Sequence, residues 1–147
     1  IAVAADARIK ELTTQAQTEV DAQRKPVEAE IKTFQASAAT LKAEDRAARE
    51  KTLSSKLQAV QTLAGQRTRE IEATRAKAMQ RINTEVQPVI AQVYKQKNCG
   101  LLVSRSAVFG GNMANDLTAA VVQGLDAKIS TISFNREVLA PAPAPAR

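Results

Sequence analysis

Residues 27–41 read VEAEIKTFQASAATL, and this stretch decides the fold. Its apolar side chains recur at alternating steps of four and three residues, at Val27, Ile31, Phe34, Ala38 and Leu41. That spacing puts them on one stripe of a helix and is typical of a coiled-coil seam. Around it, residues 5–98 hold a single glycine and two prolines among Ala, Gln, Glu, Lys and Arg, which is a helix-forming composition.

The apolar stripe continues on both sides of a break at residues 42–51. The break offers no seam residue but does offer Asp45 as a helix cap, so we predict a helix–helix turn near residues 44–47. Residues that face each other across the pair would then have numbers that sum to about 91, and sums of 84 or 98 also match several positions. The predicted seam comprises Ile9, Leu12, Val27, Ile31, Phe34, Leu53, Leu57, Val60, Ile71 and Ile82.

Two residues weaken the predicted helices near the middle of the pair. Pro26 removes an intrahelical hydrogen bond, and Gly65 lowers helix stability by roughly 1 kcal/mol relative to alanine. Their numbers also sum to 91. We predict a shared hinge at this level; an ordinary kink at Pro26 is the alternative.

The periodicity changes after residue 98, where Asn98 and Gly100 indicate a helix end. Short apolar runs at residues 101–103, 107–109 and 129–134 predict strands, and Asp116 or Thr118 can cap a short helix. The predicted core of this body, which is also its oligomer interface, comprises Leu101, Leu102, Val103, Val108, Phe109, Leu117, Val121 and Leu125.

The predicted fold class is therefore α+β, with a long antiparallel helical hairpin on a small β-rich oligomerisation body. We assign residues 1–98 to the hairpin arm, 99–135 to the body and 136–147 to a Pro/Ala-rich disordered tail. A body near 40 residues rarely stands alone, so we expect it to associate.

Composition excludes several classes of chemistry. The chain has no histidine and one cysteine, Cys99, which excludes histidine-dependent nucleophilic sites and the common zinc sites. No glycine-rich phosphate loop is present. Carboxylate pairs such as Glu70 with Glu72 lie in helical sequence, where we expect exposed charge and no desolvating pocket. We therefore expect no enzymatic activity, no metal site and no cofactor.

Positive charge is concentrated in the second predicted helix. Residues 46–81 carry nine Lys and Arg against three Asp and Glu, a local excess equal to the whole-chain net charge of +6. An ordinary solvated helix face is one interpretation; the other is a surface for a client or another anion, made by Arg67, Arg69, Arg75, Lys77 and Arg81. Acidic polypeptide, anionic lipid and lipopolysaccharide fit that surface. No aromatic residue interleaves with these cations, so no specific nucleic-acid binding is expected.

Residues 85–126 resemble the Skp, or OmpH-like, family of periplasmic chaperones. Residues 85–90 (EVQPVI) are similar to the family's helix return into the body, and 100–109 (GLLVSRSAVF) to its strand pair. Residues 116–126, which open with Asp-Leu-Thr, are similar to its D-[IL]-T helix start. The resemblance implies a homotrimer with a β-rich body and three helical arms around a cavity. There, unfolded outer-membrane proteins are held without ATP.

One departure from the family concerns the first residues. The family opens with an apolar strand, whereas Ile1–Val3 runs almost directly into helical sequence, so that strand is expected to be missing or trimmed. The resemblance and the residues together predict an ATP-independent periplasmic holdase for unfolded outer-membrane β-barrel proteins. The alternative is a structural coiled-coil adaptor or tether with a basic surface for anionic partners.

Overall fold

The computed structural model describes residues 1–129 and 131–141. Its elements are α1 (Ala2–Ser37), η1 (Ala38–Thr40), α2 (Ala43–Gln96), η2 (Arg105–Ala107), η3 (Met113–Asn115) and α3 (Thr118–Lys128). The chain forms two compact units. The body unit comprises Ile1–Arg8 and Arg75–Phe134, and the hairpin unit comprises Ile9–Thr74 and, of the segment after Phe134, the described residues 135–141.

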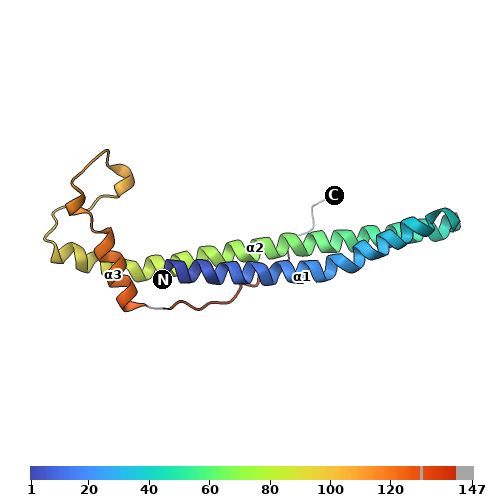
Figure 1. The fold of residues 1–147 in the computed structure, drawn as a ribbon, viewed down its shortest axis with the longest axis horizontal. Helices are drawn as coiled ribbons and strands as arrows, with labels where there is room; N and C mark the ends of the chain where they lie inside the picture. The colour runs from blue at the N-terminus through green and yellow to red at the C-terminus, as the bar shows by residue number, and fades with distance from the viewer. Residues whose placement is uncertain (130, 142–147) are drawn as a thin grey trace. The chain divides into compact units, whose positions relative to one another are not determined.

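In the hairpin unit, α1 and α2 lie side by side and run in opposite directions (Figure 1). Lys56 Nζ donates to Glu30 Oε1 over 2.7 Å, and Arg67 Nε donates to Glu19 Oε2, also over 2.7 Å. The residue numbers of each pair sum to 86. A constant sum at two places along the pair defines an antiparallel register, so the predicted antiparallel helix pair is confirmed.

The turn lies earlier than the sequence pattern indicated. The helices are joined by η1, Leu41 and Lys42, and α2 begins at Ala43, so residues 44–47 lie in its first helical turns instead of forming the connection. The register sum is correspondingly 86 and not about 91. Residues 43–51 are strong helix formers, so the helix extends N-terminally past Asp45. Asp45 sits in the first turn, where a carboxylate complements the helix dipole.

The body unit is held together by a small apolar core. Its buried members come from the start of α1, the end of α2, α3 and the segment after α3: Ala5, Ile82, Val89, Val93, Leu125 and Ile132. Helices α2 and α3 approach closely, because a Cβ built on Gly124 would lie 2.8 Å from Val89 Cγ1. Glycine at this position therefore sets how near α3 can come to α2.

Local hydrogen bonds define where α2 ends and α3 begins. Asn98 has a φ of 50°, and the Cys99 and Asn98 amides donate to the carbonyls of Tyr94 and Lys95. This is the Schellman pattern of helix termination. At α3, Asp116 Oδ1 accepts a 2.8 Å hydrogen bond from the Thr118 amide. Hydrogen bonding with Thr118 holds the pKa of Asp116 below its usual value.

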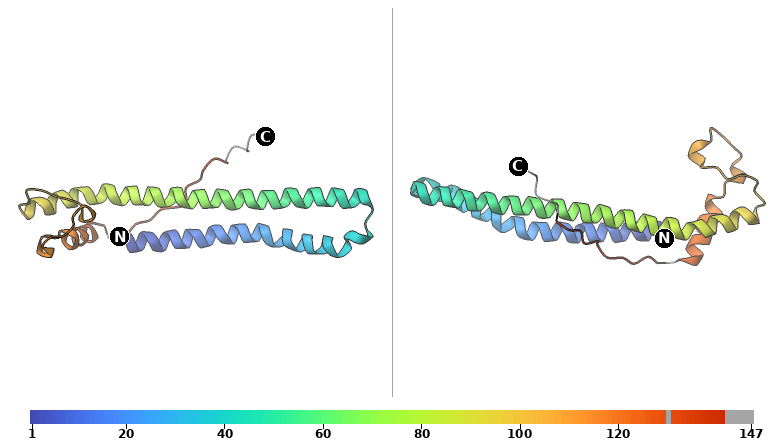
Figure 2. Two further views of the ribbon diagram at one scale, coloured as in Figure 1. Left: turned by 90° about the horizontal axis from the view of Figure 1, so that it is seen from above. Right: turned by 180° about the vertical axis from the view of Figure 1, so that it is seen from behind.

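The expected β-rich body is wrong. Over residues 1–129 and 131–141 the chain contains no strand, and the runs at 101–103 and 107–109 form loops and the 3-10 helix η2 (Figure 2). Short apolar runs become strands only when a neighbouring strand pairs with their amides and carbonyls. Residues 129 and 131–134 are also without strand structure, and Ser130 of that predicted strand lies outside the described residues.

Candidate functional site

The predicted seam residues differ in how deeply they pack. Ile9, Leu12, Val27 and Ile82 are buried, whereas Leu57 is 39% exposed. The others are half-buried: Ile31, Phe34, Leu53, Val60 and Ile71. Burial is thus greatest for seam residues of α1 up to Val27 and falls towards η1, where α1 and α2 cover each other less completely.

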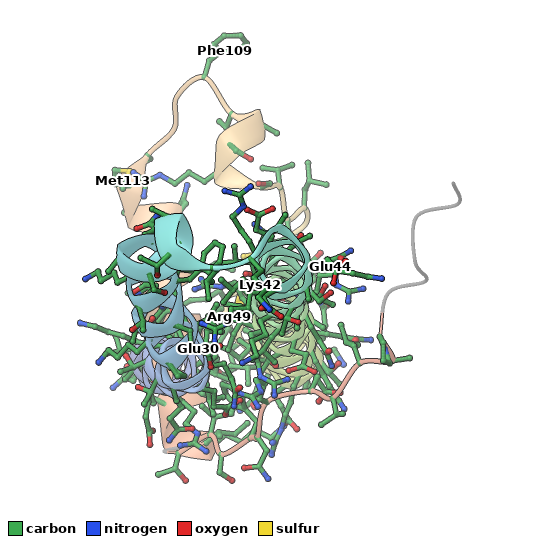
Figure 3. The ribbon with its side chains drawn as sticks, turned by 90° about the vertical axis from the view of Figure 1, so that its right-hand side faces the viewer. Glu30, Lys42, Glu44, Arg49, Phe109 and Met113 are labelled. Carbon is green, nitrogen blue, oxygen red and sulfur yellow. The ribbon has the colours of Figure 1, made fainter. Side chains whose placement is uncertain are left out.

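Two grooves lie in the hairpin unit between α1 and α2. One, of about 400 Å³, is lined by Phe34 and Leu53 together with the charged Glu30 and Arg49, whose side chains Figure 3 labels. The other, of about 810 Å³, is lined by Pro26, Val27 and Leu63 among others. Both have mixed apolar and charged walls, a lining that suits contact with polypeptide side chains.

Both helices continue through the two predicted hinge residues. Pro26 lies inside α1 and is exposed, and Gly65 lies inside α2 with open space where a Cβ would stand. With a register sum of 86, Pro26 lies opposite Val60, and Gly65 lies opposite Asp21. The proposed hinge motion stays a prediction, but the two residues are not directly opposite each other.

The hairpin unit holds a cluster of four charged side chains around one buried carboxylate. Glu19 of α1, Arg67 and Glu70 of α2, and Arg136 of the C-terminal segment (residues 135–141) make it up. Arg136 donates to both carboxylate oxygens of Glu19, over 2.9 and 3.1 Å, and Arg67 bridges Glu19 and Glu70. Glu70 is only 1% exposed. Charged groups out of water need such pairing, so the cluster is mutually dependent.

The cluster shifts the pKa values of Glu19, Glu70 and Arg67 towards their charged forms. Hydrogen bonds from Arg136 lower the pKa of Glu19 below 4.5. Burial acts to raise the pKa of Glu70, but hydrogen bonds from Gln66 and Arg67 outweigh it and the pKa falls. Burial likewise opposes the charge of Arg67, and its hydrogen bonds to Glu19 and Glu70 overcome this and raise its pKa. Glu19, Glu70 and Arg67 are therefore ionised near neutral pH.

This cluster corrects two expectations from the sequence. Glu70 is not an exposed helix charge, whereas Glu72 is exposed. The expected disorder from residue 136 onward is wrong for residues 136–139, which hydrogen-bond to both helices of the hairpin unit; residues 142–147 lie outside the described part of the chain. A lone arginine in a Pro/Ala-rich stretch carries no periodic signal, so sequence reasoning missed Arg136.

The five basic candidates have different surroundings on α2. Arg67 belongs to the ion cluster, and Arg81 Nη1 donates to the Ser133 carbonyl over 3.3 Å. Arg75 is exposed and Arg69 is half-buried. Lys77 also has an interaction partner. Arg69 and Arg75 are therefore the better placed of the five to attract an external anion.

The predicted body core divides into two groups. Leu125 is buried and Leu117 and Val121 pack against the body core, whereas Leu101, Leu102, Val103, Val108 and Phe109 are exposed. Phe109 is the extreme case, and its ring points outward at the end of a loop, with Met113 exposed on the same loop (Figure 3). The five exposed residues therefore do not form a core within one chain. We call residues 101–113 the apolar loop.

The sequence profile of the OmpH-like outer membrane protein family matches residues 2–125. A crystal structure from Caulobacter crescentus CB15, described as an OmpH-like outer membrane chaperone, is 37% identical, with a TM-score of 0.87 over 95% of this chain and 82% of that one. No curated protein matches the chain. No helix within the described residues is both long and apolar enough to cross a membrane.

Proposed function

Because the chain belongs to the OmpH-like outer membrane protein family, we propose that it is a periplasmic chaperone that holds unfolded outer-membrane β-barrel proteins without ATP. The observation that carries the proposal is the family match over residues 2–125, which spans α1, α2 and the apolar loop. Binding an unfolded chain lowers its free concentration and slows its aggregation, so this activity needs no catalytic group.

The exposed side chains of the apolar loop are evidence in favour of an assembly of several chains. Leu101, Val103 and Phe109 are 78%, 55% and 114% exposed, although side chains of this kind gain roughly 1.5–3 kcal/mol each when buried. A group of large apolar side chains left exposed is typical of an interaction site. We propose that this loop joins the subunits, that the assembly is a homotrimer, and that the helix pairs enclose the client.

Two properties of the chain suit a client of variable sequence. The grooves between α1 and α2 combine apolar walls with charged ones, so they offer weak contacts to many kinds of side chain. Several such weak contacts, made at once by linked subunits, give strong overall retention. Arg69 and Arg75 add long-range attraction, so replacing both by glutamine should slow capture at low salt and matter less at high salt.

The decisive experiment dilutes a urea-unfolded β-barrel protein into buffer with and without this protein and follows light scattering without nucleotide. We expect suppression of aggregation near stoichiometric amounts. If the chain assembles but leaves aggregation unchanged, the holdase is refuted and the structural adaptor is favoured.

Assembly is tested with the combined variant Leu101→Ser, Val103→Ser, Phe109→Ser. We expect native mass spectrometry and ultracentrifugation to find trimers of the unaltered chain and monomers of the variant, with suppression of aggregation lost in parallel. Val3→Ser is the matched control, because Val3 is 84% exposed but lies on α1. Trimers of the triple variant would refute the role of the loop.

A further inference from the structure

The C-terminal segment lies on the hairpin unit through contacts of two kinds. The first is a single charged side chain, Arg136, which enters between Glu19 and Glu70. Its two terminal nitrogens hydrogen-bond to Glu19, and its Nε lies 3.2 Å from Glu70 Oε2 as an ion pair without hydrogen-bond geometry. Planar, two-pronged contact of this sort selects arginine over lysine.

The second kind of contact involves only the main chain of the segment. The Glu137 amide donates to Thr74 Oγ1 over 2.9 Å, and Gln66 Nε2 donates to the Leu139 carbonyl over 3.4 Å. Every residue except proline offers the same amide and carbonyl. These two contacts are made by the main chain and therefore recognise an extended backbone.

The residues that make these contacts form a continuous stripe on α2. Gln66, Glu70 and Thr74 are four residues apart, which places them on one face of the helix. From Gln66 to Thr74 the helix rises about 12 Å, and three extended residues span about 10 Å. The stripe thus matches the length of a three-residue extended segment, and Thr74 Oγ1 is also tied to the Glu70 carbonyl over 2.5 Å.

The attachment in the hairpin unit buries little apolar surface. Val138 is 86% exposed, and Asn135, Ala140 and Pro141 are exposed as well. Within the site Glu70 and Thr74 are 1% and 2% exposed, whereas Glu19 is 41% exposed and Arg136, which contacts it, is 20% exposed. Because Glu19 is partly exposed, the ion pair that Arg136 makes with it is sensitive to salt.

We propose that Glu19, Gln66, Glu70 and Thr74 form a binding site for an extended polypeptide segment that carries an arginine, and that residues 136–139 of the same chain occupy it. The C-terminal segment is then an internal competitor, and an arginine-bearing stretch of an unfolded client is the external ligand. The identity of the client rests on the proposed holdase function, whereas the peptide site does not.

The site is tested with a fluorescent peptide of the sequence of residues 134–140, FNREVLA, added to the full chain carrying Arg136→Gln. We expect anisotropy to report saturable binding at least tenfold tighter than to the unaltered chain, where the tethered segment has a high effective concentration. Glu70→Gln added to this variant should remove the binding, and a peptide with glutamine in place of its arginine should bind at least tenfold more weakly.

The matched control is Lys128→Gln, which also removes a cation that is ion-paired, here with Glu85 of the body unit. It should leave peptide affinity at the level of the unaltered chain. Far-ultraviolet circular dichroism checks that each variant stays helical. Equal binding of the peptide to the unaltered and Arg136→Gln chains, or equal binding of the glutamine peptide, would overturn the proposed site.

A second measurement separates this inference from the proposed function. Saturating peptide should slow capture of an unfolded β-barrel protein by the Arg136→Gln chain; unchanged capture overturns client use of the site. If the unaltered chain suppresses aggregation but the peptide does not bind the variant, the peptide site is refuted and the holdase stands. If the peptide binds while aggregation is never suppressed, the holdase is refuted and the peptide site stands.

Discussion

Replacing Glu70 by glutamine tests whether the buried ion cluster stabilises the hairpin unit. The carboxylate accepts hydrogen bonds from Arg67 Nη1 over 2.9 Å and Gln66 Nε2 over 3.1 Å, and pairs with Arg136. A hydrogen bond to a charged group contributes about 1.5–3 kcal/mol. Because Glu19 remains as an acceptor for both arginines, we expect a net loss of about 2 kcal/mol in the free energy of unfolding, the equivalent of one charged hydrogen bond.

The assay is urea unfolding at pH 7, low salt and fixed protein concentration, followed by circular dichroism at 222 nm. The control is Glu72→Gln, which changes an exposed carboxylate two residues further along α2. We expect it to change the free energy of unfolding by no more than about 0.5 kcal/mol. Combining Glu70→Gln with Arg136→Gln should cost less than the sum of the single changes, because the partners share one network. A loss no larger than that of Glu72→Gln, or strict additivity, would refute the reasoning.

Three further predictions concern pH and packing. The pKa values of Glu19 and Glu70 are lowered on folding, so the stability that these carboxylates contribute is present above pH 4.5 and is lost as the pH falls through their folded values. The difference in the free energy of unfolding between the unaltered chain and Glu70→Gln should therefore shrink below pH 4.5. A constant difference down to about pH 3 would contradict this. Gly124→Ala should lower the melting temperature, because a Cβ 2.8 Å from Val89 Cγ1 costs about 1–3 kcal/mol by overpacking, more than the roughly 1 kcal/mol gained in helix propensity. A higher melting temperature would show that α3 shifts freely. Ile132→Ala should lower the free energy of unfolding, measured with heat or urea, by about 2–4 kcal/mol, because Ile132 is buried in the body core. The control Val138→Ala should leave the free energy of unfolding unchanged, because Val138 is exposed. Equal effects of the two substitutions would argue against that core.

The helices could be predicted because their signal is local and repeated. The alternation of Val27, Ile31 and Phe34 recurs over many turns, so single errors do not change the assignment. The turn was harder, because Ala43–Lys51 is helical by propensity and lacks a seam residue to fix the register. An antiparallel register depends on which side chains meet across the pair, and several nearby sums satisfy an alanine-rich seam almost equally.

The body could not be predicted in the same way. Leu101, Val103 and Phe109 have the composition of strands, but a strand exists only when another strand pairs with it, and over residues 1–129 and 131–141 none does. The core is instead made by residues distant in sequence, including Ala5, Val89 and Ile132. No pattern within a short window connects them.

By itself, the sequence determined a pair of long antiparallel helices, an overall positive charge and the family to which the chain belongs, because periodicity, composition and motifs are properties of neighbouring residues. Only the tertiary structure decided the register, the absence of strands over the described residues, and the meeting of Glu19, Glu70 and Arg136. The ion cluster in particular joins residues up to 117 positions apart. Burial turns such charges from independent surface groups into a network, and burial is a property of the folded chain alone.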